Sequence, residues 1–175
     1  MDSKNDCHNF VLLFYKIIQI MIEILYAISA GILGIFAGAQ IAEGVLFVPY
    51  WKSLKPTEFF ELHKTFGPKI YQFFAPLTIL ATIIPLVTVG YAFTEGIDVT
   101  KAEGLLYAEL MGICTLLFFS TYFLYFKKAN QSFADETVAH EDLAAELKKW
   151  GNWHWARIYL EIGALVFALI ALMKS

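Results

Sequence analysis

The sequence contains few charged residues and few cysteines. Asp, Glu, Lys and Arg make up 17% of the 175 residues, and the two cysteines are Cys7 and Cys114. Two cysteines so far apart form neither a disulfide framework nor a paired-cysteine metal motif. The formal net charge of −3 offers no basic surface to nucleic acid. These scarcities exclude a disulfide-rich scaffold and a zinc-ribbon domain, and they predict no nucleic-acid partner.

Apolar residues are abundant and form long runs. They make up 58% of the chain, and the mean hydropathy is +0.58. Residues 70–93 include no charge, and residues 105–126 and 152–173 are also long enough to cross about 30 Å of hydrocarbon. The run 10–51 would form a helix of about 60 Å, of which residues 27–49 suit one span. The sequence therefore predicts an all-α integral membrane protein, an antiparallel four-helix bundle embedded in the lipid bilayer.

The start of the chain differs from the rest of the first apolar run. Lys16, Gln19 and Glu23 interrupt it, so residues 1–23 are expected to form an N-terminal amphipathic extension at the membrane interface. Residues 24–173 would form a single four-span domain. Translation from Met21 would begin almost directly with a span, so whether residues 1–20 belong to the native start is left open.

The basic residues predict how the chain is oriented in the membrane. With four spans, loops one and three share one side, and together with Arg157 at the start of the fourth span they account for nine of the thirteen basic residues. The positive-inside rule then places loops one and three in the cytoplasm and both termini outside, as in a multi-pass protein of the bacterial inner membrane. Residues 131–149 are acidic and rich in alanine, and they are expected to form an exposed connecting helix on the cytoplasmic side.

Four side chains form a polar stripe at the start of the last span. At about 100° per residue, Trp150, His154, Arg157 and Glu161 fall within roughly 60° of one another on a helix. An imidazole, a guanidinium and a carboxylate inside a membrane helix indicate a functional site.

The other spans contribute polar residues at a similar depth. Glu43 is expected about 9 Å inside the cytoplasmic face, with Gln40 one turn deeper. His63 in loop one, Gln72 at the start of the second span and Asn130 after the third are expected at the rim. Together with the stripe, these residues predict a polar pocket in the cytoplasmic half of the bundle.

Three alternative interpretations remain open at this level. Arg157 could neutralise Glu43 or Glu161 in a structural ion pair, and the chain would then be a noncatalytic accessory subunit or a lipid-binding protein. Glu43, His63, His154 and Glu161 could instead hold iron, copper or zinc, assembled across helices. His63 could also be an ordinary exposed loop histidine. The metal, any other cofactor and the choice between a homo-oligomer and a larger membrane complex are not determined by the sequence.

Three segments carry a resemblance to a known family. They are residues 38–51, which include Gln40 and Glu43, then Asn130, then the pattern Trp150-x3-His154-x2-Arg157. Over residues 24–173 the chain resembles the DUF1772 family of four-span membrane proteins, also called anthrone oxygenase-like.

The resemblance implies an oxidoreductase that oxidises an apolar aromatic or quinol-like ligand with molecular oxygen. His154 or Glu43 would be the catalytic base, and Arg157 would stabilise the oxyanion. The substrate-binding residues would be Gln40, His63, Gln72, Asn130, Trp150 and Glu161.

Overall fold

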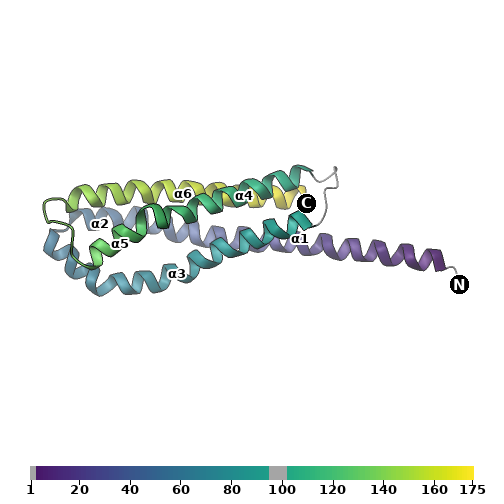
Figure 1. The fold of residues 1–175 in the computed structure, drawn as a ribbon, viewed down its shortest axis with the longest axis horizontal. Coiled ribbons are helices and arrows are strands. Elements are labelled where there is room, and N and C mark those ends of the chain that lie inside the picture. The colour runs from purple at the N-terminus through teal and green to yellow at the C-terminus, as the bar shows by residue number, and fades with distance from the viewer. Residues whose placement is uncertain (1–2, 95–101) are drawn as a thin grey trace.

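The protein is a bundle of four long helices. A computed structural model describes residues 3–94 and 102–175, and these contain helices and no strands. The long helices are α1 (Ser3–Ala42), α3 (Pro56–Thr94), α4 (Ala102–Thr121) and α6 (Leu143–Lys174). α1 and α4 each pack against both α3 and α6, so the four helices close into a ring of antiparallel neighbours (Figure 1). The expected all-α four-helix bundle is confirmed.

Short helical segments extend the first and third long helices. α1 continues through the π-helix η1 (Glu43–Phe47) into α2 (Val48–Ser53). α4 continues through a second π-helix, η3 (Tyr122–Phe126), into α5 (Lys127–Ala134). The α2–α3 and α5–α6 connections lie at the same end of the bundle, called here the connection end (Figure 1, left). α1 projects beyond the other helices at the opposite end.

Two elements at the connection end differ from the sequence-based expectation. α3 already begins at Pro56, so the first connection is very short and His63 lies in a helix rather than in a loop. The acidic segment 131–149 is not one separate helix. Its first residues end α5, residues 135–142 form turns and short irregular stretches, and its last residues begin α6.

The outward surface of the bundle is apolar. Four helices are long and apolar enough to cross a membrane, within Tyr15–Ser53, Pro56–Thr94, Glu103–Ala134 and Leu143–Lys174. Large hydrophobic side chains such as Ile35, Leu124 and Met173 are 63%, 73% and 74% exposed. In water this surface would be unfavourable, whereas lipid solvates it, so the chain is an integral multi-pass membrane protein.

The buried core has two apolar clusters separated by a polar layer. One cluster includes Phe36 and Phe118, and the other, at the connection end, includes Val48, Phe126 and Trp150. Along α6, and along α1 and η1 after Phe36, the buried polar residues lie in the sequence between these two clusters. The polar layer is therefore enclosed by apolar packing on both sides.

The π-helix η1 changes which residues of the first span face inward. The Val48 N–H donates to the carbonyl oxygen of Glu43, five residues earlier, where a regular α-helix would bond four residues earlier. Pro49 follows directly, and its ring and missing N–H disfavour regular α-helix at this point. Phe47 is 47% exposed, while Val48 is buried. The wide turn thus advances the inward face by one residue.

Candidate functional site

Five polar side chains from two helices meet in the polar layer. Gln40 and Glu43 come from α1 and the start of η1, and His154, Arg157 and Glu161 come from α6. Gln40, His154 and Glu161 are fully buried, and Glu43 is 4% exposed. We call these five residues the polar cluster.

His154 has one ring nitrogen bonded and the other unpartnered. Its Nε2 lies 2.9 Å from the backbone carbonyl oxygen of Gln40. A carbonyl oxygen can only accept, so Nε2 carries a hydrogen and donates it. In the neutral ring Nδ1 then has a free lone pair. Nδ1 has no hydrogen-bond partner and lies 3.9 Å from Oε2 of Glu43, so it is placed to accept a proton beside a carboxylate.

Arg157 bonds an amide rather than a carboxylate. Its Nη2 donates to Oε1 of Gln40 over 2.5 Å, and its Cζ lies 4.5 Å from the ring centroid of Phe126. Among the described residues, no carboxylate oxygen lies within 4.0 Å of the guanidinium. The direct ion pair considered from the sequence, with Glu43 or Glu161, is therefore absent, and a hydrogen bond joins the two helices instead.

Unpartnered buried polar atoms are concentrated in this cluster. In the described part of the chain, the buried side-chain nitrogen and oxygen atoms without a hydrogen-bond partner all belong to four of its residues: Gln40 Nε2, His154 Nδ1, Arg157 Nε, and Oε1 and Oε2 of Glu161. Each such atom costs free energy when it is removed from water and left unbonded. Both donors and acceptors are present, which suits a polar ligand group.

Aromatic rings enclose one side of the polar cluster. The Trp150 ring stacks on the His154 ring, with centroids 4.9 Å apart and planes 17° apart. Trp51 and Phe126 contact Trp150 edge-on at 5.6 and 5.3 Å. Trp150 Nε1 donates to Oδ1 of Asn130 over 2.9 Å. Asn130 therefore reaches the cluster through Trp150, which it holds in place.

Gly44 and Phe126 belong to the site but were not predicted from the sequence. A Cβ on Gly44 would lie 3.2 Å from Cδ2 and 3.3 Å from Nε2 of His154, and 3.4 Å from Cζ2 of Trp155. A side chain at this position would therefore press on the imidazole, which would have to shift by a few tenths of an ångström. Gly44 has a partial signal in the sequence, because it directly follows Glu43. Phe126 had none, because it is one of sixteen phenylalanines.

His63 and Gln72 do not join the cluster. His63 stacks on Phe59 with centroids 5.5 Å apart and contacts Phe133 edge-on at 5.9 Å. Gln72 is exposed on α3. Within the described ranges, no three His, Cys, Asp or Glu side chains lie close enough to hold a metal ion. The metal set that combined His63 with Glu43, His154 and Glu161 is therefore not assembled.

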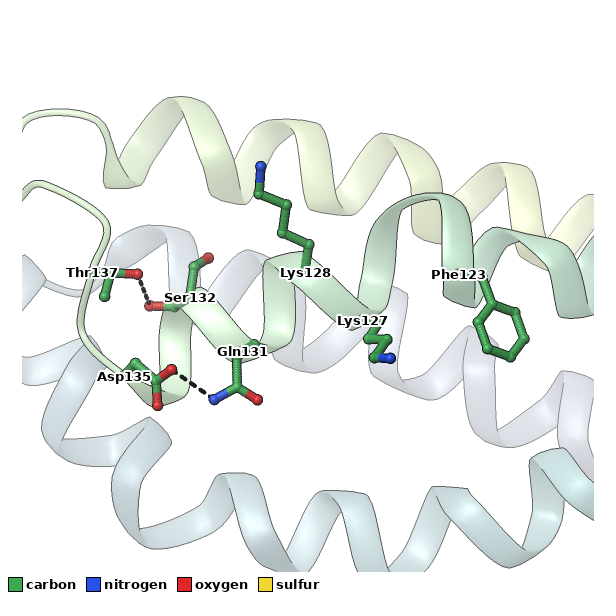
Figure 2. Close-up of a pocket in the computed structure, with 7 residues that line it drawn as sticks. All are labelled: Phe123, Lys127, Lys128, Gln131, Ser132, Asp135 and Thr137. Carbon is green, nitrogen blue, oxygen red and sulfur yellow. Dashed lines mark hydrogen bonds between the residues drawn. The ribbon is translucent and has the colours of Figure 1, made fainter.

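Two surface pockets lie outside the polar cluster. One, of 390 Å³, follows η3 and α5 and is shown in Figure 2. The other, of 500 Å³, lies between α2 and the start of α3 and is lined by Tyr50, Leu54, Glu58, Glu61, Leu62, Thr65 and Phe66. Neither pocket is lined by a residue of the polar cluster.

Comparisons with protein-family models, with curated proteins and with solved structures found no match.

Proposed function

We propose that this membrane protein binds a flat, apolar phenol-like, anthrone-like or quinol-like molecule at the polar cluster and oxidises it with molecular oxygen. The observation that carries the proposal is the convergence of unpartnered buried donors and acceptors beside the Trp150 and Phe126 rings. Aromatic walls suit a flat apolar ring system, and the few polar atoms would orient its oxygen substituents. Membership of the anthrone oxygenase-like family is part of this proposal.

The chemistry assigned to the cluster begins with a proton transfer. His154 Nδ1 accepts a proton from an acidic C–H or O–H of the substrate, and Glu43, 3.9 Å away, stabilises the imidazolium that forms. The unpartnered Arg157 Nε donates to the substrate oxyanion. The electron-rich anion then gives electrons to oxygen.

For an anthrone-like methylene, this sequence ends with a new carbonyl group and water. A carbon–oxygen bond forms, and two carbon–hydrogen bonds and the oxygen–oxygen bond break. One oxygen atom remains as the carbonyl, and the other leaves as water with the two hydrogens. The reaction thus consumes one oxygen molecule and needs no further reductant.

We further propose that the connection end faces the cytoplasm of a bacterium. Nine of the thirteen lysines and arginines are assigned to this side of the membrane, which supports the orientation. Single cysteines introduced at Ala139 and at Ser175, in a background where Cys7 and Cys114 are changed to Ser, would test it with an impermeant thiol reagent on intact spheroplasts. We expect labelling at residue 175 and none at residue 139 before lysis. The reverse pattern would overturn the orientation.

The catalytic proposal is tested by oxygen consumption of the purified protein with an anthrone or a hydroquinone, after subtraction of uncatalysed autoxidation. We expect His154→Ala to lower kcat by roughly 10²–10⁴-fold and Arg157→Ala by roughly 10²–10³-fold. His140→Ala, which changes an exposed histidine, is the matched control and should leave turnover unchanged. If both cluster variants keep full binding and turnover and lose only thermal stability, the catalytic proposal is wrong.

A second candidate function is a noncatalytic interhelical lock within a larger membrane assembly. The observation in its favour is that Gln40 accepts from Arg157 through its side chain and from His154 through its backbone, so both bonds join α1 to α6. Stable copurification with larger membrane subunits, together with no substrate turnover, would support it.

A further inference from the structure

The pocket along η3 and α5 combines an apolar end with a basic and polar end. Figure 2 shows Phe123 at one end of the row of lining side chains and Thr137 at the other. The remaining lining residues, in chain order, are Lys127, Lys128, Gln131, Ser132 and Asp135. The pocket is separate from the polar cluster, so its function does not depend on the proposed oxidation.

The apolar end of the pocket suits the hydrocarbon of a bilayer. Phe123 is 60% exposed and the neighbouring Leu124 is 73% exposed, which lipid tails tolerate and water does not. Lys127 follows about one helical turn later, and from there to Thr137 the pocket residues are polar apart from the hydrocarbon stems of the lysines. A pocket with this change of lining fits the boundary between the hydrocarbon and the phosphate groups of a bilayer.

Most polar groups of the pocket are already bonded, and the two lysines are not paired with a carboxylate. Gln131 Nε2 donates to Oδ2 of Asp135 over 2.6 Å. The hydroxyl of Ser132 donates to the Ala129 carbonyl oxygen over 2.8 Å. Among the described residues, no carboxylate oxygen lies within 4.0 Å of Lys127 Nζ or Lys128 Nζ. Two ammonium groups are thus the available donors at the boundary.

We propose that this pocket binds the phosphodiester headgroup of an anionic phospholipid. The net charge of the ionisable residues that line the pocket is +1, from Lys127, Lys128 and Asp135. This charge matches a headgroup with one net negative charge. The lysine side chains leave the helix in different directions in Figure 2, and their flexible stems let both ammonium groups turn towards one phosphate. An acyl chain of the same lipid would lie along Phe123.

The test compares two double variants that remove the same charge. Lys127→Gln/Lys128→Gln changes the pocket, and Lys64→Gln/Lys148→Gln changes two exposed lysines outside it, in segments near the connection end. Native mass spectrometry of the detergent-purified full chain would count bound phosphatidylglycerol, phosphatidylcholine and inorganic phosphate in titrations.

We expect the wild-type protein and the control variant to bind phosphatidylglycerol more tightly than phosphatidylcholine. The pocket variant should bind phosphatidylglycerol roughly 30-fold more weakly, because each of the two lysines near a membrane surface contributes about fivefold. Equal weakening in both double variants would show a diffuse charge effect and overturn the site. Binding of inorganic phosphate as tight as that of the lipid would overturn the assignment to a lipid headgroup.

Discussion

The hydrogen bond between Arg157 and Gln40 gives a direct measure of how strongly the polar cluster joins α1 to α6. Gln40→Leu removes the acceptor Oε1 but keeps the backbone carbonyl that His154 uses. The single substitution also removes the unpartnered Nε2 of Gln40, which offsets part of the loss. The stability of this variant alone is therefore a poor measure of the bond, and a double-mutant cycle with Arg157→Met is needed.

The expected coupling energy follows from the charge and the location of this bond. Hydrogen bonds to charged groups contribute about 1.5–3 kcal/mol in soluble proteins. Side-chain hydrogen bonds within membrane proteins average about 0.6 kcal/mol, with a maximum near 1.7 kcal/mol. Because the donor is a guanidinium and the acceptor is fully buried, we expect about 1.5 kcal/mol.

The free energy of unfolding would be measured in a bilayer or in mild detergent for the wild type, both single variants and the double variant. A control cycle pairs Arg157→Met with Gln72→Leu, since Gln72 is an exposed amide outside the cluster. The control should be additive to within about 0.3–0.5 kcal/mol. A Gln40–Arg157 coupling no larger than the control coupling would refute the claim that this bond holds the two helices together.

Further predictions concern the approach to His154 and the support of Trp150. Gly44→Val places new carbon atoms against the His154 ring and should destabilise the protein by about 1–3 kcal/mol in thermal unfolding, while Gly38→Val, which has open space around it, should change stability little. Equal effects of the two valines would contradict the close approach. Trp150→Phe removes the hydrogen bond to Asn130, worth about 1 kcal/mol, together with part of the packed indole ring, so it should cost more than about 1 kcal/mol; adding Asn130→Ala should then cost little more. Full additivity of these two substitutions in urea unfolding would show that they act separately.

Much of the fold follows from the length of the apolar runs. A run that exceeds the thickness of the bilayer must cross it as a helix, because lipid offers no hydrogen bonds to the backbone. The four spans could be predicted without any knowledge of long-range contacts. The residue at which the α2–α3 connection ends was harder to predict from the sequence. Residues 56–69 carry charges typical of a loop, and yet they form the first part of α3. Helical propensity and packing of Phe59 and Phe60 outweigh those charges.

The candidate site was predictable in part. Periodicity placed Trp150, His154 and Glu161 on one face of α6, and the structure buries that face. Periodicity could not identify the hydrogen-bond partner of Arg157, because the choice between Gln40 and a carboxylate depends on the rotation of α1 about its axis. The position of Gln72 at the start of the second span predicted that it lies at the rim of the pocket. The structure instead exposes Gln72 on α3, because depth in the membrane does not determine which way a side chain points.

The wide turn at residues 43–47 has a consequence for insertions and deletions. Removing one residue between Gly44 and Phe47 would let the first span continue as regular α-helix, with Glu43 and Val48 four residues apart and still on one face. Both the polar residues before the turn and the apolar residues after it would then keep their alignment with α6. Inserting one more residue would instead rotate the part before the insertion by about 100° relative to the part after it. Related sequences one residue shorter at this point should therefore keep the polar pairing with α6 without a wide turn, whereas sequences one residue longer should lose it.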